Sequence, residues 1–220
     1  MVKLAVFDWN CTLLDDFKYV NEAANILLYY FGFNHVDFDK HRKRRKNGVG
    51  NVLTESGIPK SFLEENIELI SNKFADVYEA LSGYSDLRDG AKEILYWSSE
   101  NEYENIIVSN HHRQGILPHI ERLEVPIKID NIYANGAHHN KPPKENIFLR
   151  AIEGRDVDLE NSIMVGDSLE EIQIGKKYGM NTFWISGGDL NYEAVKDYNP
   201  IKISNLTQIK DYVEVKNGKP

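Results

Sequence analysis

Residues 3–16 read KLAVFDWNCTLLDD, and the rest of the chain is organised around this stretch. Residues 4–7 form an apolar run of strand length, and a run that is apolar on both faces is typical of a buried parallel strand. Asp8 follows it directly, at the end of the strand where open α/β sheets bind ligands. Because Asp also caps turns frequently, this stretch alone leaves a ligand-binding role and a capping role for Asp8 equally open.

Length and composition limit the classes of protein that fit. The chain has 220 residues, which suits one large domain or a domain with a smaller insertion. Its formal net charge of −8 argues against nonspecific nucleic-acid binding, which usually needs excess positive charge. A single cysteine, Cys11, excludes an internal disulfide and a cysteine-based zinc cluster. Since no apolar stretch is long enough to span a bilayer, we expect a cytoplasmic protein with no membrane partner. We also expect no nucleic-acid partner, and a monomer or dimer.

Residues 15–83 show helical patterning and no strand pattern. Apolar residues recur at helical spacing over 19–30, and Ser61 with Glu64 forms a capping-box pattern at the start of a second helix that extends to Leu81. A block of helices between the first strand and the next one predicts an inserted helical domain. The expected division is therefore a core of residues 1–14 and 84–220, and a helical insertion of residues 15–83.

A basic run, KHRKRRK at 40–46, precedes the glycine-containing loop NGVG at 47–50. One interpretation is a solvated helix face. The other is a partner for an anionic substrate, since glycine-containing loops let the backbone approach a ligand. On the second interpretation the candidate substrate-binding residues are Arg44, Arg45 and Gly48.

From residue 84 onward strands alternate with helices, which predicts βαβ units and a parallel sheet. Strands are expected over 105–110, 127–133, 162–167, 182–186 and 200–203, and helices over 89–98, 114–123 (interrupted at Pro118), 145–153, 169–178 and 206–213. The right-handed crossover rule then places the carboxyl ends of the strands along one edge of the sheet.

Chemically active side chains gather at that predicted edge: Asp8, Asn10, Ser109, Asn110, Lys141, Asp167 and, one helical turn later, Glu171. Carboxylates that converge need a proton or a cation between them, and hard oxygen ligands favour Mg²⁺. Ser109 and Lys141 are donors of the kind that a phosphoryl group needs. An Asp can attack phosphorus and form an aspartyl-phosphate, so the set predicts phosphoryl transfer with Asp8 as the nucleophile.

Four segments carry a resemblance to a known family: FDWNCTL at 7–13, IVSN at 107–110, KP at 141–142 and VGDSLEE at 165–171. In this order they resemble the haloacid dehalogenase superfamily, in its phosphoglycolate-phosphatase-like members with a helical cap of the first type. The resemblance implies a Rossmann-like core, a mobile cap over 15–83, and Mg²⁺ dependence.

The resemblance also implies a role for each matched residue. Asp8 resembles the nucleophile, while Ser109 and Lys141 resemble the pair that orients the phosphate. The metal ligands would be Asp8, Asp167, Glu171 through a metal-bound water, and the backbone carbonyl of Asn10. Asn110 would lie next to the phosphate, and the loop around Arg44, Arg45, Gly48 and Gly50 is similar to the specificity loop of such caps.

Two positions depart from the family pattern. Asn10 stands where these phosphatases usually carry the Asp that protonates the leaving group, and losing a general acid–base typically costs ~10²–10⁴-fold in rate. Cys11 stands where Gly is usual. Three interpretations of Asn10 stay open: substrates with good leaving groups such as acyl phosphates, a proton from water or a cap residue, or a weakened member kept for binding.

We therefore expect a Mg²⁺-dependent phosphatase that hydrolyses a small phosphorylated metabolite through Asp8. One alternative is a catalytically weakened or silent binding protein. Another is a phosphonatase-like hydrolase of carbon–phosphorus bonds, with Lys18 as the candidate Schiff-base lysine. The histidine pairs at 111–112 and 138–139 are interpreted as loop residues at the mouth of the cleft.

Overall fold

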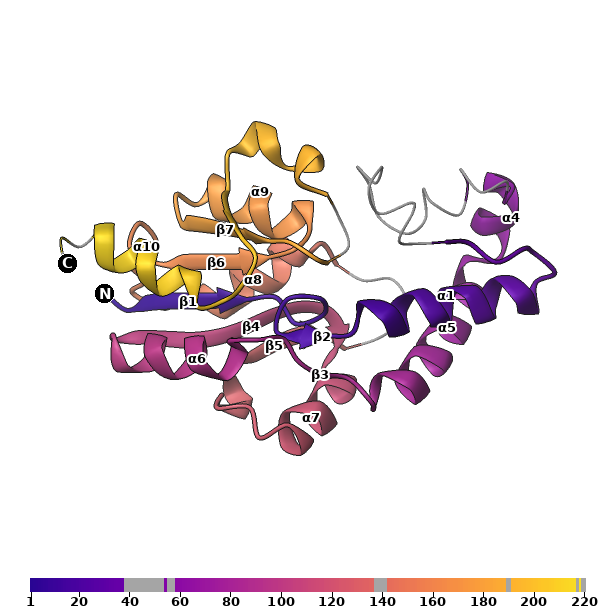
Figure 1. Ribbon diagram of the computed structural model, residues 1–220, viewed down its shortest axis with the longest axis horizontal. Helices are drawn as coiled ribbons and strands as arrows, with labels where there is room; N and C mark the ends of the chain where they lie inside the picture. Colours follow the sequence, from indigo (N-terminus) through magenta and orange to yellow (C-terminus); the bar gives the residue numbers. More distant parts are fainter. Residues whose placement is uncertain (38–53, 55–57, 137–141, 189–190, 217, 219–220) are drawn as a thin grey trace.

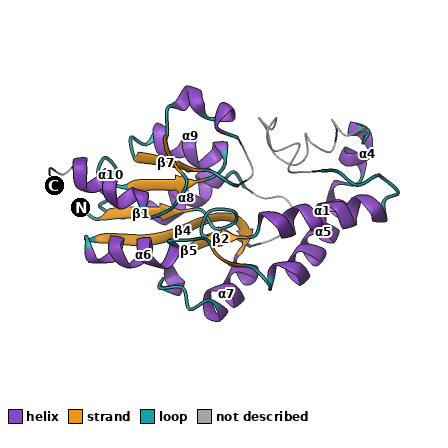
Figure 2. Ribbon diagram, in the orientation of Figure 1, coloured by secondary structure: helices purple, strands orange, loops and turns teal. Residues whose placement is uncertain are grey.

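A parallel sheet of six strands forms the centre of the computed structural model, which describes residues 1–37, 54, 58–136, 142–188, 191–216 and 218 (Figures 1 and 2). The strand order is β5-β4-β1-β6-β7-β8, and each neighbouring pair is parallel. The prediction of an α/β fold built on a parallel sheet is confirmed. The strands are β1 (Lys3–Phe7), β4 (Tyr103–His112), β5 (Ile132–Asn135), β6 (Ile163–Gly166), β7 (Asn181–Ile185) and β8 (Ile201–Ile203).

Helices cover both faces of this sheet, which explains why its central strands are apolar throughout. Leu4 and Val6 of β1 pack on one face in a cluster with residues of α8 and α9. Ala5 and Phe7 point to the other face and pack with residues of α6, α7 and α10. These helices are α6 (Ala91–Glu100), α7 (Arg113–Arg122), α8 (Lys144–Ile152), α9 (Leu169–Lys177) and α10 (Gln208–Lys216).

Three further helices project beyond the carboxyl edge of the sheet (Figure 1). They are α1 (Phe17–Tyr30), α4 (Lys60–Glu65) and α5 (Ile67–Ser82), and α1 lies alongside α5. The chain segments that lead into and out of this region form a short antiparallel pair, β2 (Leu14–Asp15) with β3 (Asp86–Leu87). The sequence did not predict this pair. That residues 15–83 form a separate cap domain stays a prediction.

Three details of the helix predictions are wrong. Ser61 is not an N-cap, because α4 begins at Lys60 after Pro59, whose fixed φ suits the start of a helix. The helix predicted to run from Ser61 is also broken at Asn66, whose backbone (φ −113°, ψ 14°) leaves the helical region. Its side-chain Nδ2 donates a 2.9 Å hydrogen bond to the Phe62 carbonyl. In addition, α7 continues through Pro118 instead of stopping there; nothing in the structure explains this.

A helix that crosses a membrane must be both long and apolar. None of the helices lying within the described residues meets both requirements.

Helix α8 offers a test of the packing on the sheet. Phe148 is fully buried against it, whereas the neighbouring Leu149 is 41% exposed. We expect Phe148→Ala to lower the free energy of unfolding by about 3–5 kcal/mol, because it removes apolar contacts and leaves a cavity. The matched substitution Leu149→Ala should change it by less than about 0.5 kcal/mol. Urea unfolding followed by circular dichroism measures both, and equal losses would contradict the described orientation of α8.

Candidate active site

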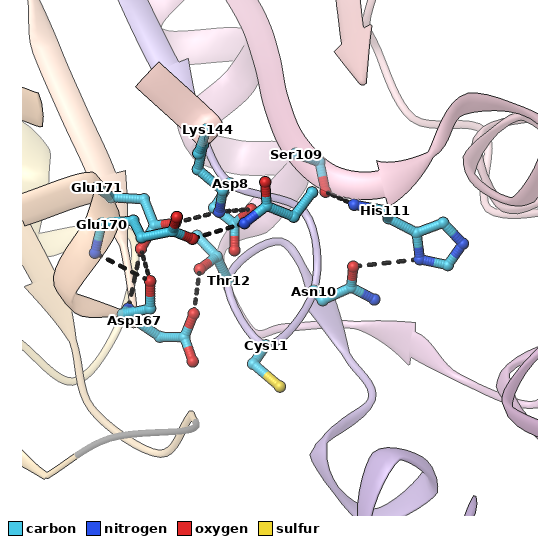
Figure 3. A network of polar contacts seen from close by, with 12 residues as sticks. Asp8, Asn10, Cys11, Thr12, Ser109, His111, Lys144, Asp167, Glu170 and Glu171 are labelled. Atoms are coloured by element: carbon cyan, nitrogen blue, oxygen red, sulfur yellow. Dashed lines mark hydrogen bonds and ion pairs between the residues drawn. The ribbon is translucent and has the colours of Figure 1, made fainter. Parts of the chain in front are cut away.

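Three neighbouring strands bring Asp8, Ser109 and Asp167 together at the carboxyl edge of the sheet (Figure 3). Asp8 follows β1, which lies between β4 and β6 in the sheet. Its backbone N–H donates a 3.0 Å hydrogen bond to Val165 of β6, so the sheet fixes the position of its side chain. All three side chains are buried.

Asp8, Asp167 and Glu171 form a cluster of buried carboxylates. One oxygen from each lies within 4.8 Å of the other two. Glu171 reaches back from the first turn of α9 because its Oε2 accepts hydrogen bonds from the backbone N–H and the hydroxyl of Ser168, at 3.0 and 2.6 Å. Gly166 makes room for it, since a Cβ at that position would collide with the Glu171 side chain.

Lys144 supplies the positive charge of this cluster. Its Nζ lies 2.7 Å from Asp8 Oδ1 and also pairs with Glu171 Oε1, and its side chain is 5% exposed. The sequence had indicated Lys141 for this task, and Lys141 lies outside the described residues. A signal for Lys144 was present: it is the first residue of α8, where the helix dipole opposes a cation. A lysine at that position indicates a carboxylate partner nearby.

The protonation of the cluster follows from burial and charge. Burial raises the pKa of Asp8 to about 7, against the opposing effect of the Lys144 ammonium and with a further rise from Glu171. Burial would also raise the pKa of Glu171, but the Lys144 ammonium and the hydrogen bonds from Lys144 and Ser168 bring it below its usual value. One ammonium therefore faces more carboxylates than it can neutralise. The remaining negative charge favours a proton on Asp8 or a further cation.

Asn10 is held by a separate hydrogen-bond network. Its Nδ2 donates to Asp16 Oδ2 and to the Tyr78 hydroxyl, each at 2.7 Å. Burial and the neighbouring Asp16 raise the pKa of Tyr78, so its hydroxyl stays protonated and donates to Asp16 Oδ2 at 2.5 Å. Since both amide hydrogens are used, the Asn10 carbonyl oxygen is fixed in the direction of His111.

His111 connects this network to α5. Its Nδ1 lies 3.2 Å from Asn10 Oδ1 and its Nε2 lies 2.8 Å from Glu79 Oε1. Burial would raise the pKa of Glu79, but the hydrogen bond and charge of His111 hold it below its usual value. His111 thus bridges the Asn10 amide oxygen and the Glu79 carboxylate. Gly115 lies against the pair, since a Cβ there would collide with both side chains.

Glu79, His111 and His112 also place possible metal-ligating atoms within 4.8 Å of one another. His112 Nδ1, however, accepts the Gly115 N–H at 3.1 Å and caps α7. The hydrogen bonds of Glu79, His111 and His112 therefore explain the arrangement of these side chains. The predicted loop position of the pair at 111–112 is wrong, because both residues end strand β4.

Two residues that the sequence did not single out hold the loop after Asp8. Asp16 precedes α1 but makes no side-chain cap there; its Oδ1 instead accepts the Cys11 N–H at 2.7 Å. Arg88 donates to the Cys11 carbonyl at 2.6 Å and to the Ser186 carbonyl at 2.5 Å. Cys11, where the family usually has Gly, takes a positive φ of 56°, which costs a non-glycine residue about 1–2 kcal/mol.

The remaining predicted residues fall into two groups. Ser109 Oγ accepts the His111 N–H at 3.1 Å, and Asn110 Nδ2 donates to Glu170 Oε2 at 2.5 Å, so both residues lie beside the cluster. Arg44, Arg45, Gly48 and Lys141, together with the pair at 138–139, lie outside the described residues. Their predicted roles stay predictions.

The charge balance around Lys144 generates a stability prediction. In metal-free buffer, we expect Lys144→Met to lower the free energy of unfolding by about 3–5 kcal/mol at pH 8, because it leaves buried carboxylates without their cation. The pKa values of Asp8 and Glu171 then lie above their unfolded values, so the loss should shrink as the pH falls toward 5 and both groups take protons. Lys176→Met, at an exposed position of α9, is the control. A loss that does not depend on pH would contradict this account.

The hydrogen-bond pattern of Asn10 generates a second stability prediction. Asn10→Asp should lower the free energy of unfolding by about 1–3 kcal/mol at pH 8, because a carboxylate replaces the donor that faces Asp16. One carboxyl of such a pair has a raised pKa in the folded state, so the loss should be absent near pH 4 and grow as the pH rises. Adding Asp16→Asn restores the donor and should recover most of the stability. Thermal unfolding of both variants measures this, and no recovery in the double variant would refute the assigned network.

Comparison with known proteins agrees with this geometry. A family model described as haloacid dehalogenase-like hydrolase matches residues 5–185. The chain is 24% identical over 221 residues to a phosphoglycolate phosphatase from Vibrio parahaemolyticus, covering 97% of each chain. It is 30% identical over 238 residues to a glyceraldehyde 3-phosphate phosphatase from Pyrococcus furiosus, covering 99% of this chain and 95% of that one. A haloacid dehalogenase-like family hydrolase of known structure from Streptococcus pneumoniae aligns with a TM-score of 0.78 at 17% identity, over 96% of this chain and 98% of that one. The resemblance carried by the four sequence segments is thus confirmed, and the chain belongs to the haloacid dehalogenase-like hydrolases.

Proposed function

We propose that this protein is a Mg²⁺-dependent phosphatase that hydrolyses a small phosphorylated metabolite through an aspartyl-phosphate on Asp8. The observation that carries the proposal is the buried Asp8 carboxylate, 2.7 Å from the Lys144 ammonium, among further carboxylates at the carboxyl edge of the sheet. The names of the relatives support it, since phosphoglycolate and glyceraldehyde 3-phosphate are both small phosphorylated metabolites. A cytoplasmic location and a monomer or dimer belong to the same proposal.

The donor set fits a magnesium ion. Asp8 and Asp167 offer buried carboxylate oxygens, and the cluster carries more negative charge than Lys144 neutralises. Hard oxygen donors of this kind are what Mg²⁺ prefers. Asp8, Asp167 and the backbone carbonyl of Asn10 would hold the ion, with Glu171 beside them. When bound, the ion supplies charge neutralisation for the phosphate and polarises its oxygens.

The chain's own residues perform the transfer. An Asp8 oxygen attacks phosphorus, the bond from phosphorus to the ester oxygen breaks, and that oxygen leaves with the electron pair. Lys144 fixes the direction of Asp8, while Ser109 lies beside the incoming phosphate as a donor. Burial raises the pKa of Asp8 to about 7, and an added cation favours the carboxylate, which is the attacking form. Water then cleaves the acyl phosphate and frees Asp8.

The amide of Asn10 transfers no proton, so the leaving oxygen takes its proton from water. The carbon–phosphorus alternative required a desolvated lysine, and Lys18 does not meet this requirement. Its side chain is exposed, and interactions with the neighbouring Tyr19 raise its pKa instead of lowering it. Schiff-base lysines need a lowered pKa, so we retain phosphatase activity as the proposal.

The proposal predicts a strict dependence on Asp8 and on the metal. Wild-type protein should hydrolyse p-nitrophenyl phosphate with Mg²⁺, and EDTA should stop the reaction. Asp8→Asn should reduce the rate to that of the uncatalysed reaction, because an amide cannot attack phosphorus. Asp197→Asn, an exposed position far from the cluster in sequence, should leave the rate unchanged.

Release of p-nitrophenol and circular dichroism, as a check of folding, are the measurements. Equal rates for wild type and Asp8→Asn would rule out the enzymatic interpretation. Phosphate binding without turnover of any phosphorylated compound would favour the silent binding protein.

A further inference from the structure

A cavity of about 520 Å³ opens beside the catalytic residues, between α1, α4, α5 and the end of β4. Asn10, Asn110 and His111 line one end of it; Asn10 lies two residues after Asp8, and Asn110 follows Ser109 and donates to Glu170, the neighbour of Glu171. The cavity then follows α5 away from the sheet, from Tyr78 and Glu79 toward Ile67, which is a span of roughly 18 Å at 1.5 Å per helical residue. It therefore starts where the leaving group of a phosphate ester on Asp8 would lie.

The walls of the cavity are apolar and aromatic. Ring pairs occur among the lining residues: Phe31 and Phe62 lie 5.4 Å apart, and Phe33 and Phe62 lie 5.2 Å apart, between ring centroids. Among the described lining residues there is no lysine or arginine, and Glu79 is paired with His111. Along these described walls, a leaving group with its own carboxylate would lose hydration without gaining a lysine or arginine partner. An apolar group would bury its surface at no such cost.

The absence of a general acid at position 10 also favours an aromatic leaving group. Without a general acid, the leaving oxygen departs as an anion, which favours alcohols that are already acidic. Phenols have a pKa near 10, as in tyrosine, whereas alkyl alcohols are, like water, far less acidic. A phenolic oxygen therefore needs the missing proton far less than an alkyl oxygen does.

We propose that the substrate is an aryl phosphate, a phosphate monoester whose phenolic leaving group occupies the aromatic cavity between α1 and α5. This inference rests on the proposed phosphatase function and adds the chemical class of the leaving group. A volume of about 520 Å³ is that of a typical small-molecule site, larger than a single ring needs, so a bicyclic aryl group should fit better than phenol.

A substrate series tests this with Mg²⁺ present. We expect kcat/KM for 2-naphthyl phosphate to exceed that for phenyl phosphate about tenfold, because the second ring buries further apolar surface. 2-Naphthylmethyl phosphate carries the same rings on an alkyl oxygen and should be about 100-fold slower than 2-naphthyl phosphate, because it needs the missing acid. Glycerol phosphate and phosphoglycolate should be slower still. Acetyl phosphate, which is small and has a good leaving group, reports on the phosphatase chemistry alone.

Cavity variants connect the preference to this site. Ala75 of α5 lines the cavity and is buried, while the next residue, Asp76, is exposed. Ala75→Leu should lower kcat/KM for 2-naphthyl phosphate at least tenfold and leave acetyl phosphate within twofold. Asp76→Leu adds the same side chain on the outer face of the helix and should change neither. Leu27→Ala removes an apolar side chain that lines the cavity, so it provides a second test if Ala75→Leu does not fold. It should lower kcat/KM for 2-naphthyl phosphate and leave that for acetyl phosphate unchanged.

The outcomes separate the two proposals. Turnover of acetyl phosphate with no preference for naphthyl over glycerol phosphate would overturn the aryl assignment and leave the phosphatase function standing. Equal rates for 2-naphthyl and 2-naphthylmethyl phosphate would overturn the requirement for a phenolic oxygen. Equal losses on acetyl and naphthyl phosphate in Ala75→Leu and Leu27→Ala would also contradict the cavity as the leaving-group site. No turnover of any of these compounds would overturn both proposals.

Discussion

The contact of Lys144 with Asp8 and Glu171 is the interaction on which the rest of the site depends. A buried ammonium between buried carboxylates is stable only if its geometry is good, because each ion loses its hydration. Several elements meet at this point. Strand β1 places Asp8, the capping box of α9 turns Glu171 back toward it, and the packing of α8 on the sheet through Phe148 places Lys144. One strand and two helices that pack on the same face of the sheet thus hold these three charged side chains together.

The core could be predicted from sequence because its signals are local. Apolar runs of three or four residues mark β1, β6 and β7, and each run is buried. Where signals compete, the prediction was weaker. The apolar residues at 127–133 suggested a strand, but β5 begins only at Ile132, after a short 3₁₀ turn at Ile129–Asn131. The pair of β2 with β3 joins segments more than 70 residues apart, and two-residue strands leave no periodic pattern.

The contrast between local and long-range signals also applies to the residues of the site. Asp8 and Asp167 could be placed from sequence because each directly follows a strand, and Ser109 because it lies near the carboxyl end of β4. Parallel strands share one carboxyl edge. Lys144 depends on where α8 begins, which in turn depends on the run of prolines before it and on packing. Tyr78 approaches Asp16 across 62 residues, and His111 approaches Glu79 across 32. Contacts of this kind depend on how helices are placed in space, and local patterning carries no information about that.

Asn10 is better understood from its partners than from the acid that it replaces. Its two amide hydrogens, the Tyr78 hydroxyl and the Asp16 carboxylate form a set in which every donor has an acceptor. A carboxylate at position 10 would break this set, so the amide has a structural reason to be there. The set also joins the loop after Asp8 to α5, the helix that forms one wall of the apolar cavity. Under the two proposals above, the residue that replaces the general acid also connects Asp8 to the space for the leaving group. An enzyme arranged in this way selects its substrate by two requirements. The leaving group must fit the apolar cavity, and the leaving oxygen must be acidic. We therefore expect one class of substrate to meet both requirements.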